Sequence, residues 1–555
     1  MAQQLCAEST CLSVVSSQGA QSSGHSALHT KQEQDSRNVA DHIQAACEIR
    51  RCPVKVLHWC IWIAACLYVM TSFATCEVNR SLPKRLNHVL TRSSYWGVTR
   101  KWDLSDREWR EGRQFILMAW PWLLLHSVIG RALAHVMPSL VPHYHAAYSL
   151  LFVTFKLGWL SAAIFFAEHA AFFGLACLGV PALCYGAALL ALTHYKVFDY
   201  DIFDGVYQWY GRNTYYLTAV TFYWTALRCL SFCMDFLWRS EETDSEKRQQ
   251  QRRLPDYWKT LAYALYLPPL LTGPLQNYDD FDASVTKPKH PVSLDEVKAC
   301  VGGLLRSAAH FLLMDFMCHY FYSSALLKAP YLVSRLNLTC LLGFGATLNV
   351  MFFVKYLVQY GVPNAFARIE CLHLPPPPKC VARSHLCSHF WRYFDHGLHL
   401  WIKKYLYLPM VGPENEVLWR LLGTALAFSF MWLWHDMTVA VTFWASLSFV
   451  GIALEVGMSQ IRKLGFTKKL EVKCQRRGWM RSVKAVLGSP HYLLTIFSCL
   501  FFLTNVEITT IFFKRVILGF PVPLLPVLAC LYFGCQASLD VMEWEHSSKV
   551  KGKTS

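Results

Sequence analysis

The chain has 555 residues, of which 54% are hydrophobic and 16% are charged, whereas a soluble domain carries about 25% charged residues. This composition excludes a disordered protein, a collagen and a small disulfide scaffold. The net charge is +16. Because the basic residues lie mostly between apolar segments, we interpret them as topology signals and contacts to anionic membrane lipids, and we expect no nucleic-acid partner.

Residues 1–50 are polar and without periodicity, which predicts a disordered N-terminal extension on the cytosolic side. Residues 51–545 form the expected polytopic core, and residues 546–555 form a polar, basic C-terminal tail. The sequence predicts membrane spans at residues 56–75, 115–137, 145–165, 171–194, 215–238, 299–325, 331–360, 418–435, 437–457, 491–513 and 516–538. The expected fold class is therefore an all-α polytopic membrane protein with about 10 transmembrane helices.

The apolar run 257–275 contains Pro268, Pro269, Gly273 and Pro274, which predicts a broken or re-entrant helix. The polar loops 239–255 and 461–484 are rich in Lys and Arg, which favours a cytosolic position for both. Counting the predicted spans from a cytosolic N-terminus does not put both loops there. We therefore expect at least one of the predicted spans to be re-entrant.

Ionisable groups inside apolar spans are expensive to insert and are functional candidates. His435 and Asp436 interrupt a long apolar stretch, since 421–434 and 437–454 contain no charged residue. A neutral imidazole is cheaper to bury than a carboxylate, and its usual pKa near 6.5 suits a general base. The alternative interpretation is a histidine whose ring is satisfied by a neighbouring backbone carbonyl.

A second candidate site is the aromatic run from Trp391 to Trp401, which includes Arg392 and Asp395. An interfacial aromatic belt with a snorkelling arginine explains the tryptophans and Arg392. It does not explain a carboxylate within the run. Asp395 could orient an imidazole or accept a hydrogen bond from an amine, and the sequence leaves both roles open.

The runs WRYFD at 391–395, GLH at 397–399 and WH at 434–435 together resemble the membrane-bound O-acyltransferase superfamily. They are most similar to its Hedgehog acyltransferase branch, the protein-cysteine N-palmitoyltransferases, in which Asp stands where most members have Asn. Asp436 and Met437 depart from the small residues expected after the histidine. The resemblance implies the superfamily's fold, with re-entrant segments around a central cavity. Further similar runs are YLP at 266–268, GP at 273–274, GVP at 361–363, PPPP at 375–378 and KCV at 379–381.

The resemblance also implies roles for single residues. His435 matches the catalytic histidine, and Asp395 matches the second essential position. Trp391 and Arg392 match residues that line the acyl-CoA site. Cys380 matches a haem iron ligand, so that haem b is an expected cofactor; the alternatives for Cys380 are an inert thiol and reversible palmitoylation.

The implied activity is transfer of a palmitoyl group from palmitoyl-CoA to the N-terminal cysteine amine of a secreted signalling protein. A Hedgehog-like protein is the expected acceptor, with an EGF-like ligand as the alternative. His435 would act as the general base, and Arg392, Lys403 and Lys404 would hold the CoA phosphates. Lys551 and Lys553 resemble a dilysine retrieval signal, which favours the endoplasmic reticulum membrane, with the Golgi membrane as the alternative.

Other functions are compatible with parts of the sequence. A glycerol-uptake-type O-acyltransferase that remodels lipid anchors shares the Asp position. An inactive paralogue acting as a regulator is disfavoured, because His435 and Asp395 are both present. A transporter is disfavoured, because no matching pair of broken helices occurs in two halves.

Overall fold

The computed structural model describes residues 53–554 except 96, 199, 245–253, 272, 384 and 414. The described chain is built from helices, with one small antiparallel sheet in which β1 (Thr91–Arg92) pairs with β2 (Lys101–Trp102). This architecture confirms the predicted all-α class. The extension expected at residues 1–50 lies outside the described residues.

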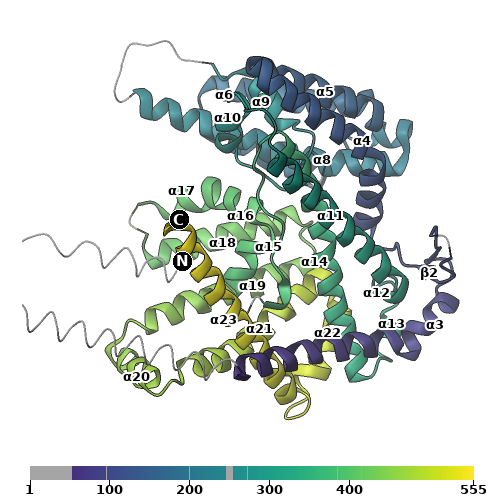
Figure 1. Cartoon of the computed structure of the whole chain (residues 1–555), viewed down its shortest axis with the longest axis vertical. Coiled ribbons are helices and arrows are strands. Elements are labelled where there is room, and N and C mark those ends of the chain that lie inside the picture. Colours follow the sequence, from purple (N-terminus) through teal and green to yellow (C-terminus); the bar gives the residue numbers. More distant parts are fainter. Residues whose placement is uncertain are drawn as a thin grey trace, which may run out of the picture.

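The N-terminal helices form two groups. A helix over residues 53–75 and α3 (Glu77–Arg85) run along the lower edge of the molecule in Figure 1. The following helices pack together in the upper part, where α6 contacts α5 and α8, and α8 contacts α7. Their bounds are α4 (Arg107–Val136), α5 (Val141–Leu157), α6 (Trp159–Leu178), α7 (Pro181–Phe198), α8 (Asp204–Asp244), α9 (Tyr257–Ala264) and α10 (Tyr278–Val285), with a 3-10 turn at Pro138–Leu140.

Two long helices join the upper and lower parts (Figure 1). They are α11 (Leu294–Tyr320) and α14 (Leu338–Ile369), which pack against each other along their length. A capping box, in which the Ser293 side chain accepts from Glu296 N–H and Glu296 caps Ser293 in return, starts α11. The short helices α12 (Ser323–Leu326) and α13 (Pro330–Val333) turn the chain between them.

The remaining helices form the lower part (Figure 1). Within it, α19 packs on α15, α18 and α21, and α21 packs on α14 and α23. The bounds are α15 (Cys387–Phe394), α16 (His396–Ile402), α17 (Leu408–Val411), α18 (Val417–Trp434), α19 (Val439–Ile461), α20 (Gly465–Arg476), α21 (Met480–Leu503), α22 (Val506–Phe512) and α23 (Leu524–Thr554), with a 3-10 turn at Val381–Arg383 and π-helical turns at Lys403–Tyr407 and Phe513–Ile517.

Within the described residues, ten helices are long and apolar enough to cross a membrane, which confirms the expected number. Many of their large apolar side chains point outward, including Leu117, Met118 and Trp120 of α4. Such a surface suits contact with lipid. The spans are Pro53–Arg85, Arg107–Val136, Trp159–Leu178, Asp204–Arg239, Leu294–Tyr320, Leu338–Ile369, Val417–Trp434, Val439–Ile461, Met480–Leu503 and Leu524–Ser548.

The two spans predicted at 145–165 and 171–194 are wrong, because the structure has three helices there, α5, α6 and α7. Gly158, with φ +88°, separates α5 from α6, and a Cβ at this position would lie 2.3 Å from the Tyr210 ring. Gly179, with φ +76°, ends α6. Glycine alone adopts a positive φ of this kind without a cost in conformational energy. Gly158 and Gly179 therefore divide into three helices an apolar stretch whose sequence predicts two spans.

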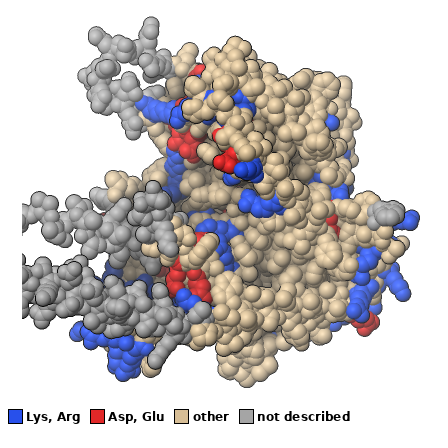
Figure 2. All heavy atoms as spheres, in the orientation of Figure 1, with Lys and Arg blue, Asp and Glu red and all other residues tan. Residues whose placement is uncertain are grey.

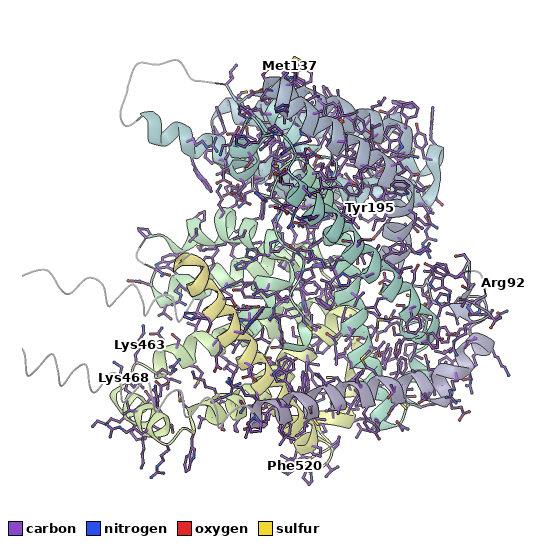
Figure 3. The ribbon with its side chains drawn as sticks, viewed as in Figure 1. Arg92, Met137, Tyr195, Lys463, Lys468 and Phe520 are labelled. Atoms are coloured by element: carbon purple, nitrogen blue, oxygen red, sulfur yellow. The ribbon has the colours of Figure 1, made fainter. Side chains whose placement is uncertain are left out.

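The structure has a break within 257–275, as predicted, but it has a helix in the segment 461–484, where a loop was expected. The break predicted within 257–275 is confirmed, because α9 ends at Ala264 and the non-helical chain that follows contains a cis Gly273–Pro274 bond. The loop expected at 461–484 contains the helix α20. Figure 2 shows basic residues gathered over α20, where Lys468, Lys469 and Lys473 are exposed. Lys463 and Lys468 lie at this edge of the molecule, and Met137 and Phe520 mark its upper and lower ends (Figure 3).

Candidate active site

His435 lies in the turn of the hairpin formed by α18 and α19. Its backbone N–H donates to the Met431 carbonyl at 3.1 Å, which closes the last turn of α18. Asp436 and Met437 both have positive φ, at +73° and +52°. The Thr438 side chain then caps α19 by accepting from Val441 N–H at 3.4 Å. Two consecutive left-handed residues thus reverse the chain directly after the histidine, where the expected small residues are absent.

Two aromatic rings hold the His435 imidazole. The Phe502 ring of α21 meets it edge-to-face at 4.8 Å, and the Trp444 ring of α19 meets it in the same way at 5.1 Å. The side chain stays partly exposed, and no described residue hydrogen-bonds to either ring nitrogen. The alternative of an imidazole satisfied by a backbone carbonyl is therefore not seen. A positioned imidazole with unused nitrogens can accept a proton from a substrate.

Asp395 occupies the junction between α15 and α16. One carboxylate oxygen caps α16 by accepting from Leu398 N–H at 3.0 Å, and the other accepts from the Tyr360 hydroxyl of α14 at 2.6 Å. Burial raises the pKa of the Asp395 carboxyl, and these two hydrogen bonds act in the opposite direction. The carboxylate is therefore held in a fixed orientation.

A series of aromatic ring contacts connects the two candidate residues. Phe394, next to Asp395, stacks on Phe352 of α14 at 5.0 Å, and Phe352 meets Phe502 at 5.7 Å. Phe502 in turn contacts His435. Within the described chain no hydrogen bond joins Asp395 to His435. The structure therefore brings both residues to one aromatic cluster in which Asp395 does not orient the imidazole.

Trp391 belongs to the same aromatic cluster. Its ring lies 5.1 Å from that of Trp444 and 5.6 Å from that of Phe428 of α18. Trp391 thus contacts the residue that supports His435. Arg392, one residue further along α15, lies with its guanidinium 6.0 Å from the Tyr393 ring and forms no ion pair with another described residue. It is free to bind an anionic group.

The two lysines proposed from the sequence to bind the CoA phosphates differ in whether acidic side chains already neutralise their charge. Lys404 pairs with Asp235 at 2.8 Å and with Asp279 at 2.6 Å, so its charge is already compensated. Lys403 is exposed. The charge of Lys404 is therefore already used within the protein, whereas that of Lys403 is not neutralised by any described residue.

Cys380 lies in the segment between α14 and α15, and its thiol is exposed. Trp62 and Tyr492 donate to the carbonyls of Ala382 and Val381, which fixes the following turn. An exposed thiol on this turn would be the residue to hold a haem iron, to which it would supply a thiolate ligand.

Sequence reasoning missed Tyr360, Trp444 and Phe502 as parts of the site. Tyr360 directly precedes the run GVP at 361–363, so this motif pointed to the correct segment without indicating the hydroxyl. Trp444 and Phe502 lie in uniformly apolar spans, where an aromatic residue reads as core. Only the packing of α19 on α21 shows that they hold the histidine.

The part of the chain that holds these residues matches a known protein family. The model of the membrane-bound O-acyltransferase family matches residues 187–498, more than half of the chain. All the candidate residues, from Cys380 to His435, lie within that range. The match confirms the resemblance predicted from the motifs and the enzyme class, acyltransferase.

Individual relatives agree with the family match. The chain is 29% identical over 321 residues to mouse protein-cysteine N-palmitoyltransferase HHAT, covering 56% of this chain and 62% of that protein. It is 26% identical over 415 residues to protein-cysteine N-palmitoyltransferase Rasp of Drosophila melanogaster, covering 74% and 79%. It is 26% identical over 273 residues to membrane-bound O-acyltransferase GUP1 of Saccharomyces cerevisiae, covering 44% and 46%.

Proposed function

Because the chain belongs to the membrane-bound O-acyltransferase family, we propose that it transfers a palmitoyl group from palmitoyl-CoA to the N-terminal cysteine amine of a secreted, Hedgehog-like or EGF-like protein. The names of the mouse and fly relatives support a cysteine N-palmitoyltransferase. The observation that carries the proposal is the His435 imidazole, held between Trp444 and Phe502 with unused nitrogens, in one aromatic cluster with the fixed Asp395 carboxylate.

The reaction needs a neutral amine and an orienting group. An α-amine has a usual pKa of about 7.7–8.0, so a base that works near neutrality can deprotonate it. The acceptor amine hydrogen-bonds to Asp395 and attacks the thioester carbonyl, and His435 takes the amine proton. The C–S bond breaks as the amide C–N bond forms, and His435 returns the proton to the CoA thiolate.

The remaining site residues bind the donor. Arg392 and Lys403 supply positive charge for the phosphates of CoA. Trp391, Phe428 and Trp444 offer an aromatic surface for the acyl chain. The proposal requires no acyl-enzyme, because the thioester is already activated.

An acylation assay tests the proposal. The purified chain in detergent receives labelled palmitoyl-CoA together with a peptide that begins with cysteine, and the same peptide N-acetylated serves as the control. We expect amide-linked label on the free peptide alone. His435→Ala abolishes this transfer, whereas His169→Gln, which changes a buried histidine bonded to Thr260 away from the site, retains it.

A lipid acceptor is the second candidate function, favoured by the similarity to the GUP1 proteins of yeasts. The same assay distinguishes it when a lysolipid replaces the peptide. Ester-linked label on the lysolipid, with no label on either peptide, would contradict palmitoyl transfer to a cysteine amine.

Two expectations complete the proposal. Haem ligation by Cys380 predicts a Soret absorption band in the purified protein that is lost in Cys380→Ala and kept in Cys530→Ala. Retrieval by Lys551 and Lys553 predicts a multi-pass protein of the endoplasmic reticulum membrane. Replacing both lysines by serine should move the protein onward to the Golgi, and an unchanged reticular location would contradict this expectation.

A further inference from the structure

Three buried residues far apart in the sequence meet in the upper part of the molecule. His126 belongs to α4, His145 belongs to α5, and Glu370 caps the C-terminal end of α14. Their exposed fractions are 0%, 1% and 3%. His126 and His145 lie outside the residues matched by the family model, and none of the three takes part in the proposed acyl transfer.

The contacts within this cluster form a closed ring. Glu370 Oε1 lies 3.1 Å from His126 Nδ1, His126 Nε2 lies 3.0 Å from His145 Nδ1, and His145 Nε2 lies 3.2 Å from Glu370 Oε2. The first two contacts are hydrogen bonds, and they use the single N–H of each neutral imidazole. The third contact would then bring together two lone pairs, and Glu370 Oε2 has no hydrogen-bond partner among the described residues. A cation between these two atoms, either a proton or a metal ion, would remove this repulsion.

The neighbouring basic residues do not supply this charge. Arg131 donates to the His290 carbonyl at 2.8 Å, to Glu296 at 3.2 Å and to the Cys371 thiol. Lys289 donates to the Ser284 carbonyl at 2.9 Å. Among the described residues, neither forms an ion pair with Glu370.

The geometry points to a metal ion, and we propose that His126, His145 and Glu370 bind a divalent cation of the zinc class. One ligand atom from each residue lies within 4.8 Å of those of the other two. Ligand atoms placed about 2.0–2.1 Å from a tetrahedral zinc ion lie about 3.3–3.4 Å apart, so the three ligand atoms here, within 4.8 Å of one another, would need to approach by at most about 1.4 Å. Two imidazoles and a carboxylate form a common zinc ligand set.

The surroundings offer two candidates for a fourth ligand. The Tyr266 ring packs 5.3 Å from that of His145 and 5.8 Å from that of His126. Its hydroxyl is buried beside Glu370, without a hydrogen bond of normal length and angle to a described residue. A cavity of about 10 Å³ also borders Glu370 and His145, which is space for about one water molecule. Gly130 keeps this space open, because a Cβ there would lie 3.2 Å from Glu370 Oε2.

The proposed metal site would link three helices. A bound ion would tie α4 and α5 to the end of α14, the helix whose Tyr360 holds Asp395. The ion would therefore position the candidate active site without touching a substrate.

Metal analysis of the full chain tests the proposal. The protein is purified in detergent without a chelator, and its zinc content is measured by inductively coupled plasma mass spectrometry. We expect about one equivalent of zinc in the wild type and in His169→Gln, and a loss of at least about 10-fold in His145→Gln and Glu370→Gln. A wild type that holds no metal, even after incubation with Zn²⁺, would overturn the proposal and assign the extra cation as a proton.

A second measurement uses the wild-type protein alone, so that it tests the proposal even if the variants fail to fold. Wild-type protein loaded with Co²⁺ is studied by X-ray absorption spectroscopy, which reports the atoms around the ion. We expect a four-coordinate shell of nitrogen and oxygen with two imidazoles. A shell that contains sulfur or lacks imidazoles would place the ion elsewhere and contradict the assignment.

Discussion

At the scale of single residues, the proposed reaction depends on how firmly His435 and Asp395 are held. The Tyr360 hydroxyl donates to Asp395 at 2.6 Å, and hydrogen bonds to charged groups contribute about 1.5–3 kcal/mol. Tyr360→Phe should therefore lower kcat/KM for the peptide acceptor by roughly 10- to 100-fold. Tyr356→Phe, one helical turn earlier on α14, is the matched control and should change it little. Equal effects of both variants would contradict the assigned contact.

The same variant predicts a change in the pH profile. Burial raises the pKa of Asp395 and the Tyr360 hydrogen bond lowers it. Activity that needs the carboxylate is present above this pKa and is lost as the pH falls through it. Tyr360→Phe removes the lowering contribution, so the acid limb of the activity profile should move to higher pH. A shift to lower pH would show that Asp395 acts in its protonated form.

The sequence predicted the candidate residues better than their surroundings. His435 and Asp395 stand out because charged or ionisable groups are rare within apolar or aromatic runs. Tyr360 has no such signal, since a tyrosine in an apolar helix is common. Lys404 was chosen for its charge, and only the structure shows that Asp235 and Asp279 neutralise it.

At the scale of elements, the turn between α18 and α19 fixes the position of His435. Met437 adopts φ +52°, and a left-handed conformation costs a non-glycine residue about 1–2 kcal/mol. Met437→Gly should raise the free energy of unfolding by up to about 1 kcal/mol, because part of that gain is lost to the flexibility of the unfolded chain. Thermal unfolding in detergent measures the effect.

The neighbouring position supplies the control for this prediction. Thr438 has φ −67° and caps α19 with its side chain. Thr438→Gly should therefore destabilise the protein, since it removes a cap and adds flexibility. If Met437→Gly also destabilised the protein, the left-handed turn would not be a source of strain.

Helix boundaries were predictable only where the sequence contains a clear break. The prolines and Gly273 within 257–275 indicated the interruption that follows α9. Gly158 and Gly179 gave a weaker signal, because glycine is common inside membrane helices and its conformation depends on packing, here against Tyr210. The helix α20 was read as a loop because its charges hide any apolar periodicity.

At the scale of the whole molecule, the ten candidate spans resolve the conflict over the basic loops. From a cytosolic N-terminus, four spans precede the loop at 239–255 and eight precede α20. Both numbers are even, so a cytosolic N-terminus predicts a cytosolic position for both segments, in agreement with their excess of Lys and Arg. Counting α5 and α7 as well adds two and leaves the side unchanged. The C-terminal tail is then also cytosolic, as a dilysine signal needs.

A labelling experiment tests this topology. Lys468 of α20 and Lys514, between α21 and α23, are both exposed. In sealed microsomes with the cytosolic face outward, an amine reagent that cannot cross membranes should modify Lys468 and should reach Lys514 only after the membrane is permeabilised. Mass spectrometry locates the label. Modification of Lys514 in sealed vesicles would contradict the predicted arrangement.

The most direct measurement of the central claim is a single-turnover experiment on the acyl-transfer step. Enzyme in excess is loaded with labelled palmitoyl-CoA, mixed with the peptide that begins with cysteine, and quenched at short times. General-base catalysis contributes about 10²- to 10⁴-fold, so His435→Ala should slow amide formation by at least about 100-fold while palmitoyl-CoA binding stays unchanged. An undiminished rate in His435→Ala would show that His435 does not serve as the base.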